Sequence, residues 1–531
     1  MALSDLIEYH ERSKHHINRY APGPRQLDWA NQPDPFRVFV GAPRLNLPLA
    51  ADALPTRFNA MRRGTLPPPH AFDLRSLAAL FELSLGLSAW KSFGGTRWAL
   101  RCNPSSGNLH TTEGYLLSSS LPGVPAGAYH YVSREHALER RALVDDPRWT
   151  SAFPAGGVVV GLSSIHWREA WKYGMRAWRY CQHDCGHAMA AVSYAAAALG
   201  WQTRLLEAPG DDLVAALLGL DRKQDFMAAE AEAPDALLWI APDPAVSPQA
   251  DMMRDALHSA TWLGHANPLS PGHVAWPDIE AIHRATHKPT TPARGVRAAM
   301  SQPVPTDPRL DIVFATLARQ RRSAVNFDGV THIDAASLFT MLDALRVRPN
   351  IPPWNALDSA PQVHLAVMVH RVTGLEAGLY VFLRDPRDES ELAAALRREW
   401  LWRKVGPETL PLYLMLPYDL RESAKLICCH QDIAADSCFV LGMLAPLRRT
   451  GDESWRYRQL FWECGMLGHV LYLESEAAGV RSTGIGCYFD DEMHELLGIV
   501  GVAWQSLYHF TTGGPVEDTR LSTLPPYEFR P

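Results

Sequence analysis

The stretch Arg179-Tyr-Cys-Gln-His-Asp-Cys-Gly186 has a counterpart 279 residues further on, Arg458-Gln-Leu-Phe-Trp-Glu-Cys-Gly465. The same shift aligns Asp211-Asp212 with Asp490-Asp491, without a gap. One shift that holds over about forty residues indicates a duplicated domain, because the units of solenoid repeats are much shorter. The chain is therefore expected to contain two copies of one fold.

The duplication extends upstream and leaves a proline-rich segment between the copies. Arg62-Arg63-Gly64 aligns with Arg321-Arg322-Ser323. Proline lacks a backbone donor and resists both helix and central strand, so the proline-rich segment is predicted to be a linker. The predicted division is an N-terminal extension at 1–60, a first domain at 61–286, the linker at 287–308 and a second domain at 309–531.

Strand-like and helix-like patterns alternate within each copy. Residues 157–162 and 366–370 are short β-rich runs, which are typical of strands. Residues 74–85 place apolar side chains on one helical face, and residues 188–199 are nearly all alanine or apolar, as in a buried helix. This mixture predicts an α+β fold.

Composition and charge exclude several classes of protein. The 531 residues are 47% hydrophobic and 20% charged, with a net charge of −6 and a pI near 6.4, so no basic surface for nucleic acid is expected. No secretory signal opens the chain and no run of about 18 apolar residues occurs, so no membrane span is expected. The eight cysteines follow no regular spacing. We therefore expect a cytoplasmic protein without disulfides.

Three short motifs have groups that could bind a ligand, although each motif is also common in proteins without that role. Ser105-Ser106-Gly107-Asn108 offers backbone N–H groups and small donors, but the same residues form common surface turns. Arg321-Arg322-Ser323 offers guanidinium groups with the geometry for a phosphate, but most arginine pairs are solvated. Gly484-Ile485-Gly486 lets the main chain approach a ligand closely, as any glycine-rich loop does.

Read together, the motifs resemble those of the nitroreductase superfamily. The segment Lys172-Tyr173-Gly-Met-Arg-Ala-Trp-Arg-Tyr180 is similar to one in its SagB-type (azoline dehydrogenase) branch. The resemblance implies FMN as the cofactor. It implies that the flavin ring packs on Ser105, Ser106, Gly107 and Asn108, that Arg321, Arg322 and Ser323 hold the phosphate side, and that Gly484, Ile485 and Gly486 approach flavin N5 and O4.

The departures from the family pattern indicate which of the two copies contributes each part of a flavin site. The family has a basic residue at the position of Val325, and Arg530 is the expected substitute. The first copy has Gly64 in place of Ser323, and the second has Pro352-Pro353 where a Pro-Ser turn would fall. A family homodimer builds each flavin site from both protomers. The chain is therefore predicted to fold as two tandem nitroreductase-like domains that form an internal pseudo-dimer with one intact flavin site.

Lys172 and Tyr173 are the candidate catalytic residues. The resemblance implies that one of them removes a proton while hydride passes to flavin N5, and the adjacent lysine is expected to favour the tyrosine phenolate. The alternative is that both side chains only cover apolar surface. His183 and His187 share a helical face from which Cys185 points away, so no metal site is expected.

The implied activity is that of an FMN-dependent dehydrogenase or oxidase. Its substrate would be an azoline-like peptide or a small amino-acid-derived molecule, with oxygen or another acceptor reoxidising the flavin, and its partners would be that substrate and components of a biosynthetic complex. Two alternatives stay open: an NAD(P)H-dependent nitro or quinone reductase, and a scaffold that keeps the fold without turnover.

Overall fold

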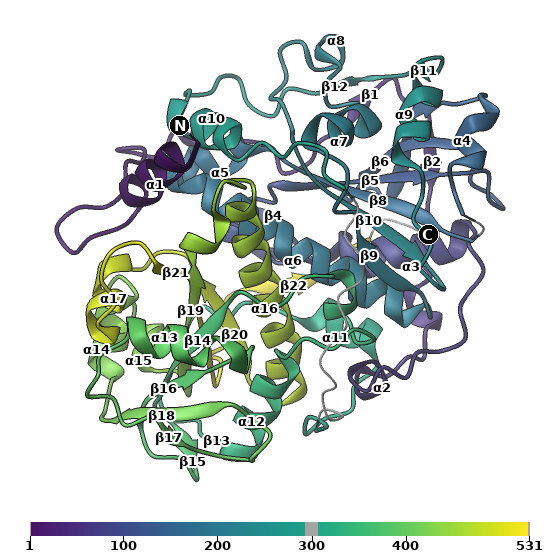
Figure 1. Ribbon diagram of the computed structural model, residues 1–531. Helices are drawn as coiled ribbons and strands as arrows, with labels where there is room; N and C mark the ends of the chain where they lie inside the picture. Colours follow the sequence, from purple (N-terminus) through teal and green to yellow (C-terminus); the bar gives the residue numbers. More distant parts are fainter. Residues whose placement is uncertain (1, 155, 293–305, 529–531) are drawn as a thin grey trace.

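The computed structural model describes residues 2–154, 156–292 and 306–528. The middle of the predicted linker and Arg530 lie outside these residues. The chain forms two α+β units that lie side by side, and both contribute to the central region of the molecule (Figure 1).

Each unit contains a sheet with the same strand order. In the first, the order is β7-β6-β5-β8-β10-β9, and in the second it is β18-β16-β14-β19-β21-β20, with antiparallel pairing throughout. The strands of the first sheet are β5 (Thr112–Ser118), β6 (Gly127–Val132), β7 (Ala137–Leu143), β8 (Val158–Ser164), β9 (Gln202–Leu205) and β10 (Ala233–Ala241). Those of the second are β14 (His364–Val369), β16 (Gly378–Phe382), β18 (Leu412–Pro417), β19 (Phe439–Pro446), β20 (Arg481–Ile485) and β21 (Trp504–Gly513). The shared order confirms the duplicated α+β fold.

Corresponding helices begin with the same cap in the two units. Helix α3 (Leu74–Ser84) starts after Asp73, whose carboxylate accepts a 2.8 Å hydrogen bond from the Ser76 backbone N–H. Helix α12 (Ala335–Ala344) starts after Asp334, which accepts the equivalent bond from Ser337 at 2.7 Å. An aspartate at this position satisfies a donor that the first turn leaves free.

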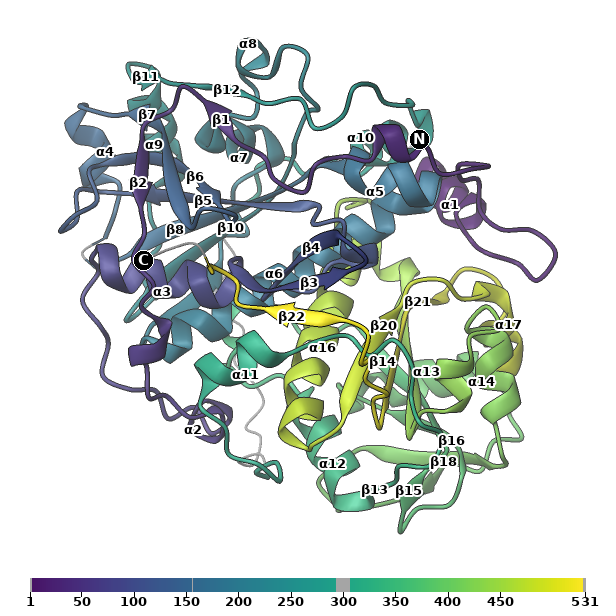
Figure 2. The same ribbon diagram turned by 180° about the vertical axis from the view of Figure 1, so that it is seen from behind.

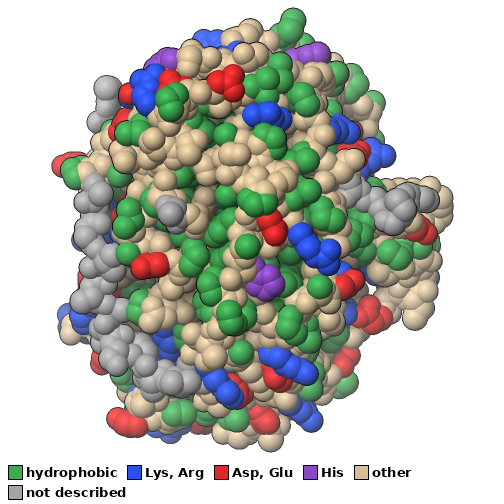
Figure 3. Space-filling view, turned by 90° about the vertical axis from the view of Figure 1, so that its right-hand side faces the viewer, with side chains coloured by type: hydrophobic (Ala, Val, Ile, Leu, Met, Phe, Trp, Pro, Cys, Tyr) green, Lys and Arg blue, Asp and Glu red, His purple; other side chains and the backbone are tan. Residues whose placement is uncertain are grey.

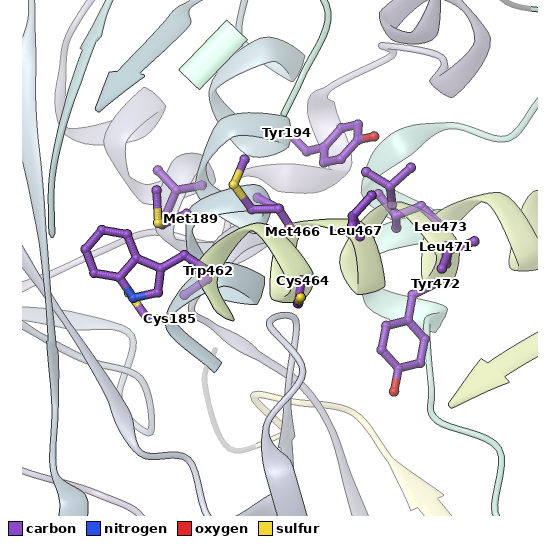
Figure 4. Close-up of a cluster of buried hydrophobic side chains, with 14 of the residues drawn as sticks. Cys185, Met189, Tyr194, Trp462, Cys464, Met466, Leu467, Leu471, Tyr472 and Leu473 are labelled. Carbon is purple, nitrogen blue, oxygen red and sulfur yellow. The ribbon is translucent and has the colours of Figure 1, made fainter. Parts of the chain in front are cut away.

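Two long helices form the seam between the units. Helices α6 (Ala177–Ala198) and α16 (Arg456–Ala477) pack against each other through buried apolar side chains (Figure 4). A Cβ on Gly186 would lie 2.1 Å from the Trp462 carbonyl oxygen, and a Cβ on Gly465 would lie 2.2 Å from that of His183. The two glycines of the repeat therefore allow the helix backbones to touch.

The chain ends reach across the seam. Strand β22 (Ser522–Leu524), near the end of the chain, pairs with β3 (Leu87–Phe93) of the first unit, which in turn pairs with β4 (Thr96–Arg101) (Figure 2). Helix α1 (Ala2–Arg12), at the start of the chain, contacts the second unit, where His10 Nδ1 lies 2.8 Å from the Tyr457 hydroxyl oxygen. The ends of the chain thus tie the two units together.

The surface carries acidic and basic side chains side by side, as one face shows (Figure 3). Within the described ranges, no helix is long and apolar enough to cross a membrane.

Candidate functional site

A cavity of about 1210 Å³ opens between the two units and is lined by residues of both. The sequence motifs, although far apart along the chain, meet in its wall. Its lining includes Ser105, Ser106, Gly107, Asn108, Tyr173, Arg321, Arg322, Ser323, Gly484, Ile485 and Gly486. Lys172 is not part of this lining.

A buried aspartate on α6 holds the first motif in place. Asp184 accepts hydrogen bonds from the Ser105 hydroxyl at 2.8 Å, and from the Ser106 hydroxyl and backbone N–H at 2.9 Å each. Burial raises the pKa of Asp184 to about 6 even though these donors favour its charged form. Since both serine hydroxyl protons point to Asp184, the serines shape the turn rather than offer free donors to a ligand.

Arg321 and Arg322 bring two positive charges to the cavity wall. Arg321 is buried and donates to the carbonyl oxygens of Cys102 at 3.2 Å and Arg101 at 3.1 Å. Among the described residues, neither guanidinium forms an ion pair with a carboxylate. Burial lowers the pKa of both, and that of Arg322 falls to about 10. A buried cation without an acidic partner, such as Arg321, favours an anionic ligand, and the half-buried Arg322 adds a second positive charge beside it.

The corresponding arginines of the first unit are neutralised. Arg62 Nε lies 2.5 Å from Glu474 Oε1 in a buried ion pair, and Arg63 donates to Asp307 at 2.9 Å. The charges of Arg62 and Arg63 are thus balanced by carboxylates, whereas those of Arg321 and Arg322 are available for an anionic ligand.

The Gly484 to Gly486 segment packs under aromatic rings. A Cβ on Gly484 would lie 1.9 Å from the Tyr508 hydroxyl oxygen, and a Cβ on Gly486 would lie 2.5 Å from Tyr180 Cε1. The Gly484 N–H donates to the Tyr472 hydroxyl at 3.2 Å, and that hydroxyl also contacts Ser323 Oγ at 2.7 Å. Tyr472 thus links the second and third motifs.

Tyr173 lies directly over the first motif. It is the last residue of α5 (His166–Tyr173), and a Cβ on Gly107, whose φ is 58°, would lie 2.7 Å from the Tyr173 hydroxyl oxygen. Lys172 Nζ is 5.1 Å from the centroid of the Tyr173 ring. Burial, followed by the nearby Glu169, raises the pKa of Tyr173 well above its ordinary value. The expectation of a phenolate is therefore wrong: the environment holds a neutral phenol.

The sequence reasoning missed the acidic group nearest to this pair. Glu169 precedes Lys172 and Tyr173 by one helical turn, a spacing that could have identified it. It is buried, and within the described part of the chain neither carboxylate oxygen has a hydrogen-bond partner. Burial raises its pKa well above the ordinary value, and Asp184 adds to the effect. Glu169 therefore lies next to the candidate catalytic pair in surroundings that favour its neutral form.

Among the described residues, a second and smaller cavity lies at the pseudosymmetric position. It measures about 120 Å³ and is lined by Leu205, Glu207, Gln459, Glu463 and Met466. These residues align, at the shift of 279, with Gly484, Gly486, Tyr180, Asp184 and His187 of the large cavity. Bulkier side chains thus replace both glycines, and the volume falls below the roughly 300 Å³ at which ligand pockets begin.

No cluster of metal-binding side chains occurs among the residues with described positions, including His183 and His187. His183 instead stacks on Tyr508, with ring centroids 4.1 Å apart.

Comparison with solved structures defines the fold class. The chain matches a candidate nitroreductase from Anabaena variabilis at a TM-score of 0.68 and 21% identity, over 96% of this chain and 99% of that one. The E. coli microcin synthetase McbBCD complex gives a TM-score of 0.28 at 13% identity, over 37% of this chain and 70% of that one. An FMN- and NADPH-dependent nitroreductase, NfnB, from a Sphingopyxis strain gives 0.22 at 14%, over 39% and 90%. Neither a protein-family model nor a curated protein sequence matches the chain. The fold is that of nitroreductases, arranged as an internal pseudo-dimer.

Proposed function

We propose that the protein is an FMN-dependent oxidoreductase with one flavin in the cavity between its two units. The observation that carries this proposal is the contrast between the two arginine pairs. Within the described residues, the buried Arg321 and the half-buried Arg322 line a cavity of about 1210 Å³ without a carboxylate partner, whereas Arg62 and Arg63 are each paired with an acid. Guanidinium groups bind phosphate through paired hydrogen bonds, and two of them suit the double charge of a phosphate monoester.

The residues present fit such a cofactor. Arg321 and Arg322 would hold the phosphate and Ser323 the ribityl chain, while Gly107 and Asn108 would lie against the ring. Gly484, Ile485 and Gly486 would supply the main chain on the opposite side. Arg530 is proposed as a further phosphate contact. When bound, FMN supplies a two-electron acceptor for hydride from a substrate C–H bond.

The chain's own contribution is to orient the substrate and to move a proton. Tyr173 presents a neutral hydroxyl over Gly107, and Lys172 lies against its ring. A neutral phenol can accept a proton only if it donates its own hydroxyl proton at the same time. We therefore propose that Lys172 and Tyr173 act together as a proton relay, without a phenolate in the resting protein. An azoline-like peptide or a small amino-acid-derived molecule is the proposed substrate class, on the resemblance of this pair to that of SagB-type enzymes.

The absorption spectrum of the purified protein tests the proposal. Bands of an oxidised flavin, and FMN in the supernatant after denaturation, are expected. A colourless protein that does not bind added FMN would contradict the proposal and favour the alternative of a scaffold that keeps the fold without turnover. Bleaching of the flavin by NADPH alone would favour the nitro or quinone reductase, since the dehydrogenase needs its own substrate to reduce the flavin.

A further inference from the structure

One wall of the large cavity is a three-stranded sheet that combines the first unit with the end of the chain. Strand β3 lies between β4 and β22 in this sheet (Figure 2). Lys91 of β3 is directly opposite Trp98 of β4 and Thr523 of β22, so the three side chains project from the same face. All three line the cavity. Trp90 projects from the other face and packs near Phe36, with ring centroids 6.1 Å apart. The sheet therefore presents Lys91 to the cavity.

Arg322 of the second unit reaches the strand that carries Lys91. Its guanidinium donates to Ser88 Oγ at 3.3 Å and to the Ser88 carbonyl oxygen at 3.4 Å. Ser88 belongs to β3 and precedes Lys91 by three residues. Burial, followed by the nearby charge of Arg322, lowers the pKa of Lys91. Two positive charges from different units thus lie on one wall, and a negatively charged ligand between them would relieve their repulsion.

The charge of Lys91 is not balanced by a carboxylate. Its ammonium group donates to the Thr523 hydroxyl oxygen at 2.7 Å, which is a neutral partner. Two acids also line this cavity, but each is paired with an arginine. Glu517 accepts a hydrogen bond from Arg481, and Asp518 lies 2.8 Å from Arg520. Within the described ranges, no carboxylate lies at ion-pair distance from Lys91, so its charge is available to a ligand.

The hairpin that carries Lys91 is a feature of the first copy. Strands β3 and β4 follow α3 and precede β5. The corresponding stretch of the second copy, residues 345–363 between α12 and β14, is fully described and contains a short 3-10 turn (Trp354–Ala356) but no strand. The second copy therefore has no counterpart of Lys91, and this lysine serves the large cavity alone.

We propose that Lys91 is a specificity-determining residue that, together with Arg321 and Arg322, makes the cavity select a flavin with a phosphate monoester over one without it. This inference rests on the proposed function. A phosphate monoester carries a charge of about −1.5 to −2 at pH 7, which several cations balance better than one. Arginine binds phosphate through a fixed fork of donors, whereas lysine is a point charge on a flexible stem and can turn from Thr523 to the ligand. The phosphate would thus be bound by both units.

Titration of the flavin-free full chain with FMN and with riboflavin, which lacks the phosphate, tests this selection. The wild type should bind FMN more tightly. Lys91→Gln keeps a hydrogen-bond donor for Thr523 but removes the charge. It should raise the Kd for FMN about tenfold and leave the Kd for riboflavin within about twofold of the wild type. Lys91→Arg should keep the preference for FMN.

Arg97→Gln is the matched control on the same hairpin. Arg97 is not part of the cavity lining: its guanidinium lies over the Trp90 ring, 4.5 Å from the centroid, and 3.4 Å from a Glu528 carboxylate oxygen. The variant removes one positive charge as Lys91→Gln does, so it should change neither Kd if the position of the charge decides the selection.

The possible results separate this inference from the proposed function. An equal rise in both Kd values for Lys91→Gln would mean that Lys91 only supports the sheet, and an unchanged Kd for FMN would mean that it does not meet the phosphate. Either result overturns the inference while the wild type still binds FMN as proposed. A wild type that binds neither flavin would overturn the proposed function and this inference with it.

The salt dependence of binding is a second readout. Because salt screens charge interactions, a higher salt concentration should weaken the binding of FMN to the wild type more than that of riboflavin. This difference should be smaller in Lys91→Gln, which has one cation fewer at the phosphate. The same salt dependence of FMN binding in both proteins would contradict a role of the Lys91 charge.

Discussion

At the scale of single residues, the charge partners of four arginines distinguish the two halves of the molecule. Arg321→Ala removes one of two unpaired guanidinium groups from the cavity wall, so it should weaken FMN binding. A charge-assisted contact of this kind contributes about 1.5–3 kcal/mol, which corresponds to a roughly ten- to hundredfold higher Kd. Fluorescence titration of the flavin-free protein with FMN measures this change.

Arg62→Ala is the matched control, and it should lower the stability of the protein without changing its affinity for FMN. It leaves Glu474 buried without its partner, a loss that typically costs about 3–5 kcal/mol of stability. The variant should therefore unfold at a lower temperature, while the folded fraction binds FMN like the wild type. If Arg62→Ala and Arg321→Ala weakened FMN binding equally, the assignment of the two halves would be wrong.

Tyr173→Phe tests the proton relay. The variant should fold and bind FMN, while substrate oxidation falls by about two to four orders of magnitude, the usual size of an acid–base contribution. Because burial raises the Tyr173 pKa, the phenol stays protonated through the neutral range and no phenolate limb should appear in kcat/KM below pH ~9. Lys172→Ala is compared in the same assay, and reduction by dithionite should be unchanged in both. A Tyr173→Phe variant with near wild-type turnover would reduce the pair to a packing role.

The sequence could predict the cavity residues because each motif is local, but it could not predict their partners. The Glu474 that neutralises Arg62 lies 412 residues away in the chain. The sequence assigns no partner to Asp184, whereas in the structure it holds the Ser105 and Ser106 hydroxyl groups. The phenolate prediction failed for a related reason: the burial that raises the Tyr173 pKa is a property of the folded chain.

At the scale of elements, the two long helices show which features of the repeat are structural. The sequence predicts a buried helix at 188–199 and a helical face shared by His183 and His187, and α6, which begins at Ala177, contains both. Its first turns carry Arg179 and His183, which are polar yet buried because residues of the other unit, Asp490 and Tyr508, cover them. Without that contact, a polar stretch gives no sign of burial.

Gly186→Ala should disrupt the seam between the helices. The added Cβ would lie 2.1 Å from a backbone carbonyl oxygen of α16, which has no flexible end that could yield. Overpacking of this kind typically lowers the free energy of unfolding by about 1–3 kcal/mol. Because the neighbour of the added Cβ is rigid backbone, we expect a loss at the upper end of this range for Gly186→Ala. Gly479→Ala, with no heavy atom within 4 Å of its Cβ, is the control and should lose only about 1–2 kcal/mol through its left-handed backbone. Thermal unfolding compares the two, and an equal loss would mean that the helices separate easily.

At the scale of the whole molecule, two units with the same strand order lie in one chain, so their sites can differ. In a symmetric homodimer, any substitution that fills one site fills both. Here the second copy keeps the arginines and glycines of the cavity, and the first copy keeps the turn and Tyr173. The opposite site contains Glu207 and Leu205 where the large cavity has glycines. Of these two cavities, as the described residues form them, the larger one has room for a ligand of flavin size.

The stoichiometry of bound flavin tests this asymmetry. Flavin released by denaturation, measured against protein concentration after saturation with FMN, should approach one per chain, because the second cavity of about 120 Å³ is too small and Arg62 is already paired. Arg321→Ala combined with Arg322→Ala should remove that single equivalent at FMN concentrations that saturate the wild type. A ratio near two, or one equivalent retained by the double variant, would show that the first unit also holds a phosphate, and the proposed division of labour between the units would fail.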